Sequence, residues 1–184
     1  MGTTHAARRM LVWLFAGVAV TFFCLAAAAP NAFAYFASRI YNAGSGTCMS
    51  SGGTHTGGAD ARLYTCNGSA NQTWVNAVRN SGGSLFKNLG DGWCLNNYRG
   101  RAANYNPQTL WPCDASSWMQ AYYVYSSRVA PGYYNIETVN ASGNITGYCL
   151  SSLGNRNNGA IVEEFACNNT YPNQAWEGGT LTPP

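Results

Sequence analysis

The sequence predicts an all-β domain built from three similar repeats, and two observations carry this prediction. The first is composition: behind an apolar leader the chain is rich in glycine, asparagine, serine and tyrosine, which favour turns and strands over helices. The second is spacing: six cysteines form three pairs, 18 or 19 positions apart, and a glutamine and an aromatic residue follow each pair. No long segment behind the leader has the periodicity of an amphipathic helix.

The leader, residues 1–34, has the features of a secretory signal peptide. Two arginines precede a nearly unbroken apolar run at residues 10–29, and the small residues Ala32 and Ala34 end the segment. We expect cleavage after Ala34, which predicts a secreted, extracellular protein of residues 35–184 without a membrane span. The apolar run is also nearly long enough to cross a bilayer, so an uncleaved anchor is the alternative.

The charge balance of the predicted mature chain excludes several classes of partner. Over the whole sequence ten basic residues oppose seven acids, a net charge of +3. Behind the leader eight basic residues oppose the same seven acids, which leaves a net charge of +1. Nucleic acids and anionic membranes bind proteins with clustered basic surfaces. We therefore expect neither of them as the main partner.

The cysteines behind the leader predict three disulfides. Six is an even number in an exported chain, and the regular separations suggest that each repeat closes a loop of its own. Such a loop stabilises the fold by about 3 kcal/mol in the chain-entropy model. The expected pairs are Cys48 with Cys66, Cys94 with Cys113, and Cys149 with Cys167. Zinc is the rival use of cysteine, but no C-x2-C pair occurs and His55 is the only histidine behind the leader, so we expect no metal and no cofactor.

Further features recur at fixed offsets from the cysteines. A glycine lies two residues before each first cysteine, and an aromatic residue lies two residues before each second cysteine. We expect the repeats at approximately residues 39–80, 84–126 and 133–178. The third repeat is longer, with extra residues expected around Asn140 to Ile145. No repeat is large enough to bury its own apolar face, so the three should close around a shared axis.

These residues resemble the ricin B-type lectin family, whose members adopt a three-lobed β-trefoil. The likeness covers approximately Arg39 to Trp176 and rests on three Gln-x-aromatic units in register with three cysteine pairs. The resemblance implies a β-trefoil in which each repeat carries one intra-repeat disulfide. It also implies a structural role for the aromatic residue of each unit, which packs in the core of family members; these residues are Trp74, Tyr122 and Trp176.

The resemblance implies one sugar site in each lobe. In sugar-binding members the aromatic residue before the second cysteine faces the apolar side of a pyranose, while polar groups orient its hydroxyls. The candidate rings are Tyr64, Trp111 and Phe165, and ordinary packing beside the disulfide is their alternative role. The polar candidates are Ser50, Asn71 and Gln72 in the first lobe, Asn96 and Gln120 in the second, and Ser151, Glu163, Asn173 and Gln174 in the third.

The sequence departs from the family at one of the sugar-binding positions. Family members have an aspartate two residues after the first cysteine, where Ser50, Asn96 and Ser151 stand here. A carboxylate makes stronger, charge-assisted hydrogen bonds to hydroxyls than serine does, so galactose binding should be weakened or lost. Met119 also replaces the asparagine that the other two lobes have. We expect the first and second lobes to bind. In the third lobe Glu163 is a candidate substitute for the missing acid, and a solvated charge on a strand is its alternative role.

The sequence thus predicts a secreted, non-catalytic carbohydrate-binding protein. It would bind glycan or polysaccharide through up to three weak sites, whose contributions combine on a polymer. The alternative is a degenerate trefoil that acts as a protein-interaction or toxin-targeting subunit without sugar binding. Catalysis is not expected, because no nucleophile, zinc-protease or phosphate-loop motif occurs. Glu163 and Glu164 should also point to opposite faces of a strand.

Overall fold

The computed structural model describes residues 37–53, 56–78, 83–179 and 181, all of which belong to one compact unit. Within these ranges the chain forms short strands and 3₁₀ turns, so the all-β prediction is confirmed. None of the helices in the same ranges is long and apolar enough to cross a bilayer. The predicted signal peptide, residues 1–34, and His55 lie outside the described residues.

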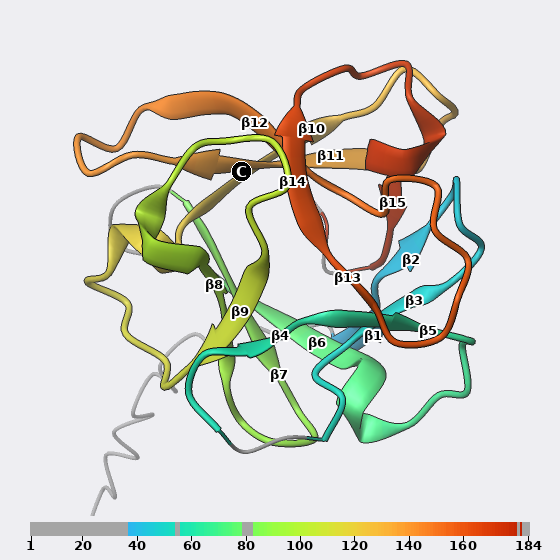
Figure 1. The fold of residues 1–184 in the computed structure, drawn as a ribbon, viewed down its shortest axis with the longest axis horizontal. Coiled ribbons are helices and arrows are strands. Elements are labelled where there is room, and N and C mark those ends of the chain that lie inside the picture. Colours follow the sequence, from blue (N-terminus) through green and yellow to red (C-terminus); the bar gives the residue numbers. More distant parts are fainter. Residues whose placement is uncertain (1–36, 54–55, 79–82, 180, 182–184) are drawn as a thin grey trace, which may run out of the picture. The chain divides into compact units, whose positions relative to one another are not determined.

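Each repeat folds into a lobe of short strands in which a 3₁₀ turn, labelled η, precedes the last strand (Figure 1). The first lobe contains β1 (Ala37–Arg39), β2 (Tyr41–Asn42), β3 (Cys48–Ser50), β4 (Ala59–Asp60), β5 (Arg62–Tyr64), η1 (Ala70–Gln72) and β6 (Thr73–Val78). The second contains β7 (Ser84–Asn88), β8 (Cys94–Asn97), η2 (Tyr98–Gly100), β9 (Gln108–Trp111), η3 (Trp118–Gln120) and β10 (Tyr122–Ser126). The third contains β11 (Tyr134–Val139), β12 (Ile145–Ser151), β13 (Ala160–Ile161), β14 (Glu163–Ala166), η4 (Pro172–Gln174) and β15 (Trp176–Glu177).

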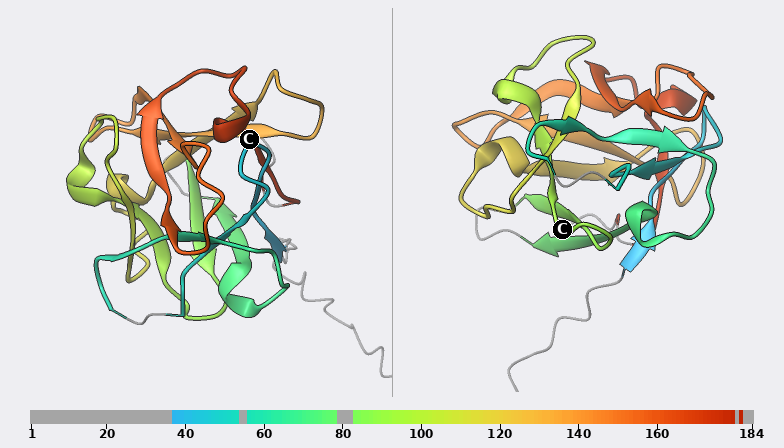
Figure 2. Two further views of the ribbon diagram at one scale, coloured as in Figure 1. Left: turned by 45° about the vertical axis from the view of Figure 1, so that its right-hand side comes forward. Right: turned by 60° about the horizontal axis from the view of Figure 1, so that its bottom comes forward.

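Antiparallel pairing both builds the lobes and joins them. Within the lobes the hairpins are β3–β5, β8–β9 and β12–β14, and these lie around a common centre in Figure 1. Between the lobes β6 pairs with β7, β10 pairs with β11, and β15 pairs with β2. Figure 2 shows the same arrangement from two further directions.

Three backbone hydrogen bonds form a closed ring at this centre. The Ala61 amide donates to the Gln108 carbonyl over 2.8 Å, the Gln108 amide donates to the Val162 carbonyl over 2.8 Å, and the Val162 amide returns to the Ala61 carbonyl over 2.9 Å. Each lobe contributes one residue at the equivalent position. The shared axis that the repeats predict is therefore present, and Ala61, Gln108 and Val162 surround it.

The core is built from equivalent residues of the three lobes. Most sets are apolar and fully buried: Ile40, Phe86 and Ile136; Met49, Leu95 and Leu150; and Trp74, Tyr122 and Trp176. Two sets are mixed: Glu164 stands where the other lobes have Leu63 and Leu110, and the central set combines Gln108 with Ala61 and Val162. The burial of the three Gln-x-aromatic rings agrees with the structural role predicted for them. Each lobe alone has too few such residues to form a core, so the lobes depend on one another for stability.

The three predicted disulfides are confirmed. Cys48 is bonded to Cys66, Cys94 to Cys113, and Cys149 to Cys167. Each disulfide links the first strand of one hairpin to the residues just after its second strand, with Cα–Cα distances of 5.1, 4.9 and 4.9 Å. The extra residues of the third lobe lie where predicted, in the turn between β11 and β12 and the adjoining part of β12.

Candidate functional site

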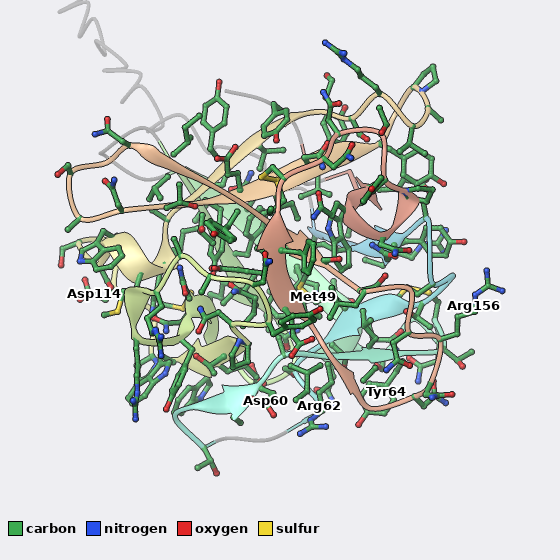
Figure 3. All side chains as sticks on the ribbon, turned by 45° about the horizontal axis from the view of Figure 1, so that its top comes forward. Met49, Asp60, Arg62, Tyr64, Asp114 and Arg156 are labelled. Carbon is green, nitrogen blue, oxygen red and sulfur yellow. A yellow bond between two sulfur atoms is a disulfide. The ribbon has the colours of Figure 1, made fainter. Side chains whose placement is uncertain are left out.

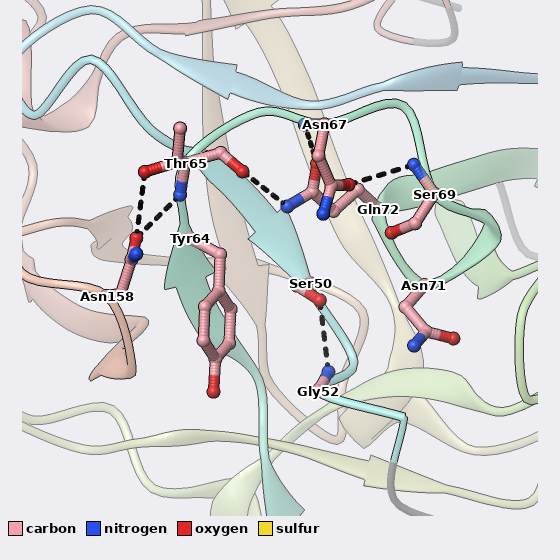
Figure 4. Close-up of a pocket in the computed structure, with 9 residues that line it drawn as sticks. All are labelled: Ser50, Gly52, Tyr64, Thr65, Asn67, Ser69, Asn71, Gln72 and Asn158. Carbon is pink, nitrogen blue, oxygen red and sulfur yellow. Dashed lines mark hydrogen bonds between the residues drawn. The ribbon is translucent and has the colours of Figure 1, made fainter.

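The first lobe contains an open cavity of about 350 Å³ beside its hairpin. All four candidate residues of this lobe line it, together with residues of the following loop and one from the third lobe. The lining residues are Ser50, Gly52, Tyr64, Thr65, Asn67, Ser69, Asn71, Gln72 and Asn158. Figure 4 shows the Tyr64 ring and the Asn71 amide on either side of Ser50.

Hydrogen bonds fix most of the polar groups around this cavity. The Ser50 hydroxyl accepts the Gly52 amide over 3.1 Å, which holds the turn that follows β3. The Asn158 carboxamide oxygen accepts the Thr65 amide over 2.7 Å and the Thr65 hydroxyl over 3.1 Å. Among the described residues, the side-chain amide of Asn71 has no hydrogen-bond partner. The Asn71 carboxamide packs against Gly53 and Gly90, and its N–H groups can donate to a ligand without breaking an existing bond.

The cavity suits a neutral ligand that carries hydroxyl groups. None of the described residues that line it is charged. The half-buried Tyr64 provides a flat apolar surface, and hydroxyl and carboxamide groups surround that surface. A ring of this kind covers the C–H face of a pyranose while the polar groups meet its hydroxyls. The missing family aspartate is not replaced by another carboxylate in this lobe.

The three glutamines of the Gln-x-aromatic units hold the loop after the second cysteine of each lobe. Gln72 donates to the Thr65 carbonyl over 2.9 Å and accepts the Asn67 amide over 2.8 Å. Gln120 makes the same pair of bonds with Pro112 and Asp114, and Gln174 makes it with Ala166 and Asn168. All three are buried. These bonds give the glutamines a structural role, while their predicted sugar contact stays a prediction.

The aromatic residues that end these units also make equivalent contacts in two lobes. The indole N–H of Trp74 donates to the Met49 carbonyl over 2.9 Å, and that of Trp176 donates to the Leu150 carbonyl over 3.0 Å. In the second lobe the Tyr122 hydroxyl instead donates to the Gln108 carboxamide oxygen over 2.8 Å. The second lobe therefore differs from the other two inside the core.

The second lobe exposes its candidate ring but uses its polar group internally. The Trp111 side chain is 44% exposed and lies against the backbone of Gly57. Asn96 is buried, and its amide donates to the Asn97 carbonyl over 2.9 Å and to the Thr109 hydroxyl over 3.3 Å. A sugar on Trp111 would thus lack both the Asn96 amide and the asparagine that Met119 replaces. Binding by this lobe stays a prediction.

The third lobe separates its candidate residues. Ser151 accepts the Leu153 amide over 3.0 Å, in the same turn that Ser50 forms in the first lobe. Glu163 lines a second cavity, which also contains Arg62 but neither Phe165 nor Asn173. Burial raises the pKa of the Glu163 carboxyl, and the negative charge of the nearby Asp60 raises it further. Figure 3 shows Asp60 beside Arg62, whose guanidinium it binds over 2.9 Å.

Phe165, the candidate ring of the third lobe, packs against a residue that the sequence did not single out. Tyr105 approaches it edge-on, with the ring centroids 5.5 Å apart and an interplanar angle of 79°. Asn173 occupies the position of Asn71, and its side-chain amide likewise has no partner among the described residues. The third lobe therefore presents an aromatic pair, away from the cavity that Glu163 lines.

Glu164 is fully buried beside the second lobe, whereas Glu163 is partly exposed, so the two face opposite sides of β14 as predicted. One carboxylate oxygen of Glu164 accepts the Gln108 amide over 3.3 Å, and the other accepts the Ala103 backbone amide over 3.4 Å. Burial raises the pKa of Glu164 to about 7, although these bonds and those from Thr138 and Asn106 oppose the rise.

Residues from neighbouring lobes were missed by the sequence analysis. Asn158 of the third lobe enters the first-lobe cavity, and Tyr105 of the second lobe meets Phe165. Asn158 directly precedes Gly159 of the third lobe. Tyr105 occupies the equivalent position in the second lobe, and the first lobe has Gly58 there. A tyrosine where two repeats have glycine was the available signal for Tyr105.

One possible metal-ligand set occurs among the described residues. The side chains of Glu137, Cys149 and Cys167 lie close together. The two sulfur atoms are bonded to each other in a disulfide, so neither is available as a thiolate ligand. This group does not form a metal site in the oxidised protein.

Comparisons with known proteins agree with this architecture. A family model described as the ricin-type beta-trefoil lectin domain matches residues 36–135. No curated protein matches the sequence.

Among solved structures, the designed threefold-symmetric protein ThreeFoil is similar, with 17% identity, a TM-score of 0.67, and coverage of 77% of this chain and 96% of that chain. The Rhizoctonia solani agglutinin has 19% identity, a TM-score of 0.65, and coverage of 82% and 98%. A Macrolepiota procera ricin B-like lectin in complex with lactose has 16% identity, a TM-score of 0.64, and coverage of 78% and 94%. At these identities the likeness establishes the fold, and the predicted β-trefoil is confirmed.

Proposed function

The chain belongs to the family of ricin-type β-trefoil lectin domains, and from this premise we propose that it is a carbohydrate-binding protein whose first lobe holds the principal sugar site. The observation that carries the proposal is the first-lobe cavity. It combines the Tyr64 ring, the unpartnered Asn71 amide and a lining without charged side chains. The ring would receive the apolar face of a neutral sugar, and Asn71 would bind its hydroxyls.

The proposed site binds weakly and gains strength on a polymer. Ser50 stands in place of the family's aspartate, and a neutral hydroxyl makes weaker hydrogen bonds than a carboxylate. Its oxygen is also the acceptor of the Gly52 amide. Several weak contacts combine by effective concentration when the ligand repeats along a chain. The proposed natural ligand is therefore a neutral polysaccharide or a clustered glycan.

The proposed binding does not involve catalysis by this chain. Glycosidases need two carboxyl groups on either side of the scissile bond. Glu164 is enclosed in the core, and Glu163 lines a different cavity from the Tyr64 ring. This placement supports a binding role for the first lobe.

Binding to neutral polysaccharides tests the proposal. The mature protein is applied to a glycan array and to a panel of polysaccharides by affinity electrophoresis. Tyr64→Ala is expected to weaken binding to the best neutral ligand about tenfold, because a stacked ring contributes about 1 kcal/mol or more. Trp111→Ala serves as the matched ring control and should retain binding. Folded protein that binds no neutral glycan, or that loses binding only in Trp111→Ala, would refute the first-lobe assignment.

We also propose that the protein is secreted after removal of residues 1–34. Three disulfides support an oxidising compartment, and the apolar leader ends in small residues. N-terminal sequencing of exported protein should begin at Tyr35. Protein that stays in the membrane fraction with Met1 intact would support the uncleaved anchor instead.

A further inference from the structure

The first-lobe cavity is lined by two asparagines that each stand directly before a glycine. The sequence contains this pair at Asn67–Gly68 and at Asn158–Gly159. One asparagine comes from the first lobe and the other from the third, and both line the cavity. In such a pair the backbone nitrogen of the glycine can attack the side-chain amide carbon of the asparagine, because glycine has no Cβ to obstruct the approach. The cavity therefore contains two candidate positions for spontaneous deamidation.

Deamidation of an asparagine needs no enzyme and no reactant other than water. The glycine nitrogen loses its proton and forms a bond to the asparagine Cγ. The bond from Cγ to Nδ2 breaks, and Nδ2 takes up the proton and leaves as ammonia. Water then opens the resulting cyclic imide at either carbonyl, which gives aspartate or isoaspartate. The reaction replaces a neutral carboxamide with a carboxyl group that is ionised at neutral pH.

The Asn67–Gly68 pair has a free nucleophile and a polarised carbonyl. The Gly68 amide donates to none of the described residues, and no atom lies within 4 Å of the position that a Cβ would take on this glycine. The Ser69 amide donates to the Asn67 carboxamide oxygen over 2.9 Å (Figure 4). Negative charge develops on this oxygen during the attack, and a donor already aimed at it stabilises that charge. Both residues of the pair are exposed, so water reaches the imide.

The Asn158–Gly159 pair lacks the free nucleophile. The Gly159 amide donates to the Leu63 carbonyl over 2.8 Å, so attack on the Asn158 side chain would break a hydrogen bond between two lobes. The Asn158 carboxamide oxygen also accepts both the amide and the hydroxyl of Thr65, which hold the side chain in place (Figure 4). Two pairs of the same composition in one cavity therefore differ in their expected reactivity.

The fold accepts a carboxylate at the position of Asn67. The second lobe has Asp114 there, and the third has Asn168. In all three lobes the side-chain oxygen of this residue accepts the amide two residues later, over 2.9, 2.8 and 3.1 Å. Its own amide donates to the glutamine of the Gln-x-aromatic unit in each lobe. Conversion of Asn67 to aspartate keeps both bonds, so it changes the charge of the cavity and not the loop.

We propose that Asn67 is a site of spontaneous deamidation whose product places a carboxylate in the first-lobe cavity. None of the described residues that line the unconverted cavity is charged. The consequence for ligands rests on the proposed carbohydrate-binding function. A carboxylate in the cavity of the Tyr64 ring attracts the ammonium group of an amino sugar. The converted protein therefore binds a polymer of amino sugars more tightly than the unconverted protein does.

Ageing of the folded protein, followed by peptide mapping with mass spectrometry, tests the modification. The mature protein is incubated at mildly alkaline pH, because the attack requires loss of the glycine amide proton. Conversion at Asn67 should be about tenfold faster than at Asn158, where the attack must first break a hydrogen bond. In reduced and denatured protein, the control, both pairs should convert at similar rates. Equal rates in the folded protein, or faster conversion at Asn158, would overturn the proposal.

A substitution tests the ligand consequence separately. Asn67→Asp supplies the product directly and should strengthen the binding of chitosan oligosaccharides at mildly acidic pH about threefold, the value of one exposed charge pair. Asn168→Asp makes the same change at the equivalent position of the third lobe and should leave this affinity unchanged. Thermal midpoints of both variants should stay close to that of the unchanged protein. An unchanged affinity in Asn67→Asp would refute the ligand consequence, while the ageing rates decide the modification without reference to sugar binding.

Discussion

The first and second lobes share a backbone arrangement and a disulfide, yet they differ in the core and at the surface. In the first lobe Trp74 bonds to a backbone carbonyl, and an open polar cavity lies outside it. In the second lobe Tyr122 bonds to the buried Gln108, and Asn96 uses its amide within the lobe. Side chains at equivalent positions of the two lobes therefore make different hydrogen bonds, although the backbone is similar.

This difference teaches that the repeat pattern specifies the scaffold and not the site. The glutamines make identical bonds in every lobe, because they hold the loop that the fold requires. A residue of a neighbouring lobe lies beside the candidate ring in the first and third lobes, and it differs between them: Asn158 lines the cavity of Tyr64, and Tyr105 contacts Phe165. Binding therefore depends on which loop faces the ring.

The largest expected effect concerns the buried Glu164 of the third lobe, which bonds to Gln108 of the second lobe. Burial raises its pKa from 4.5 to about 7, so the folded state retains a proton that the unfolded state loses between these pH values. The contribution of Glu164 to the free energy of unfolding is then fully present below pH 4.5, falls as the pH rises through this window, and is lower above it by about 3 kcal/mol.

Chemical denaturation across this pH range measures the effect. In Glu164→Gln the fall should shrink to the smaller contributions of Glu137 and Glu163, whose pKa values burial also raises. The first lobe has Leu63 at the equivalent position and contributes no such titration. An unchanged pH profile in Glu164→Gln would mean that this carboxyl does not control the stability of the core.

The next effect tests what the two lobes share. Gln72→Ala and Gln120→Ala should each lower the free energy of unfolding by about 1–3 kcal/mol, because each leaves a loop amide and a carbonyl without its partner. Thermal unfolding of both variants checks this expectation. Ser142→Ala, at an exposed turn, is the control. A large loss in one variant alone would show that the lobes hold their loops differently.

A smaller effect distinguishes the surfaces. Asn71→Ala should weaken binding of a neutral polysaccharide about fivefold, the value of roughly one hydrogen bond. Stability should remain unchanged, because the Asn71 side chain has no partner among the described residues. Asn173→Ala makes the same change in the third lobe and should keep the affinity. Titration calorimetry compares the two variants, and equal losses would contradict a site confined to the first lobe.

The smallest effect is a gain in the second lobe. Met119→Asn supplies the polar group that the first lobe has at this position. Affinity for a neutral polysaccharide should rise about twofold. This gain is smaller than that of one full hydrogen bond, because Asn96 stays bonded to Asn97 and Thr109 and cannot assist. Binding measured in a Tyr64→Ala background isolates this contribution. If the second lobe then bound as tightly as the first lobe does, the asparagine at this position alone would account for the difference between the two lobes.

The sequence was sufficient for the fold because its signals are repeated. The cysteine spacing predicted three disulfides that all occur, and the Gln-x-aromatic units predicted three buried rings. Each of these patterns lies within one repeat, so it can be recognised without knowing how the other lobes pack against it. Alternation along β14 likewise placed Glu163 and Glu164 on opposite faces.

The sites were less predictable because they form between lobes. Asn158 reaches the first-lobe cavity from 94 positions after Tyr64, and Tyr105 meets Phe165 from 60 positions before it. No spacing within a repeat indicates such contacts. The internal hydrogen bonds of Asn96 were equally hidden, since they depend on the rotamer and on Thr109 across the hairpin.

Chemical-shift mapping with a neutral oligosaccharide tests the central claim most directly. Isotope-labelled mature protein is titrated with an oligosaccharide of the polymer that binds best. We predict the largest shifts at Ser50, Tyr64, Asn71 and Asn158, around the first-lobe cavity. Shifts centred on Trp111, with the first lobe unaffected, would contradict the account.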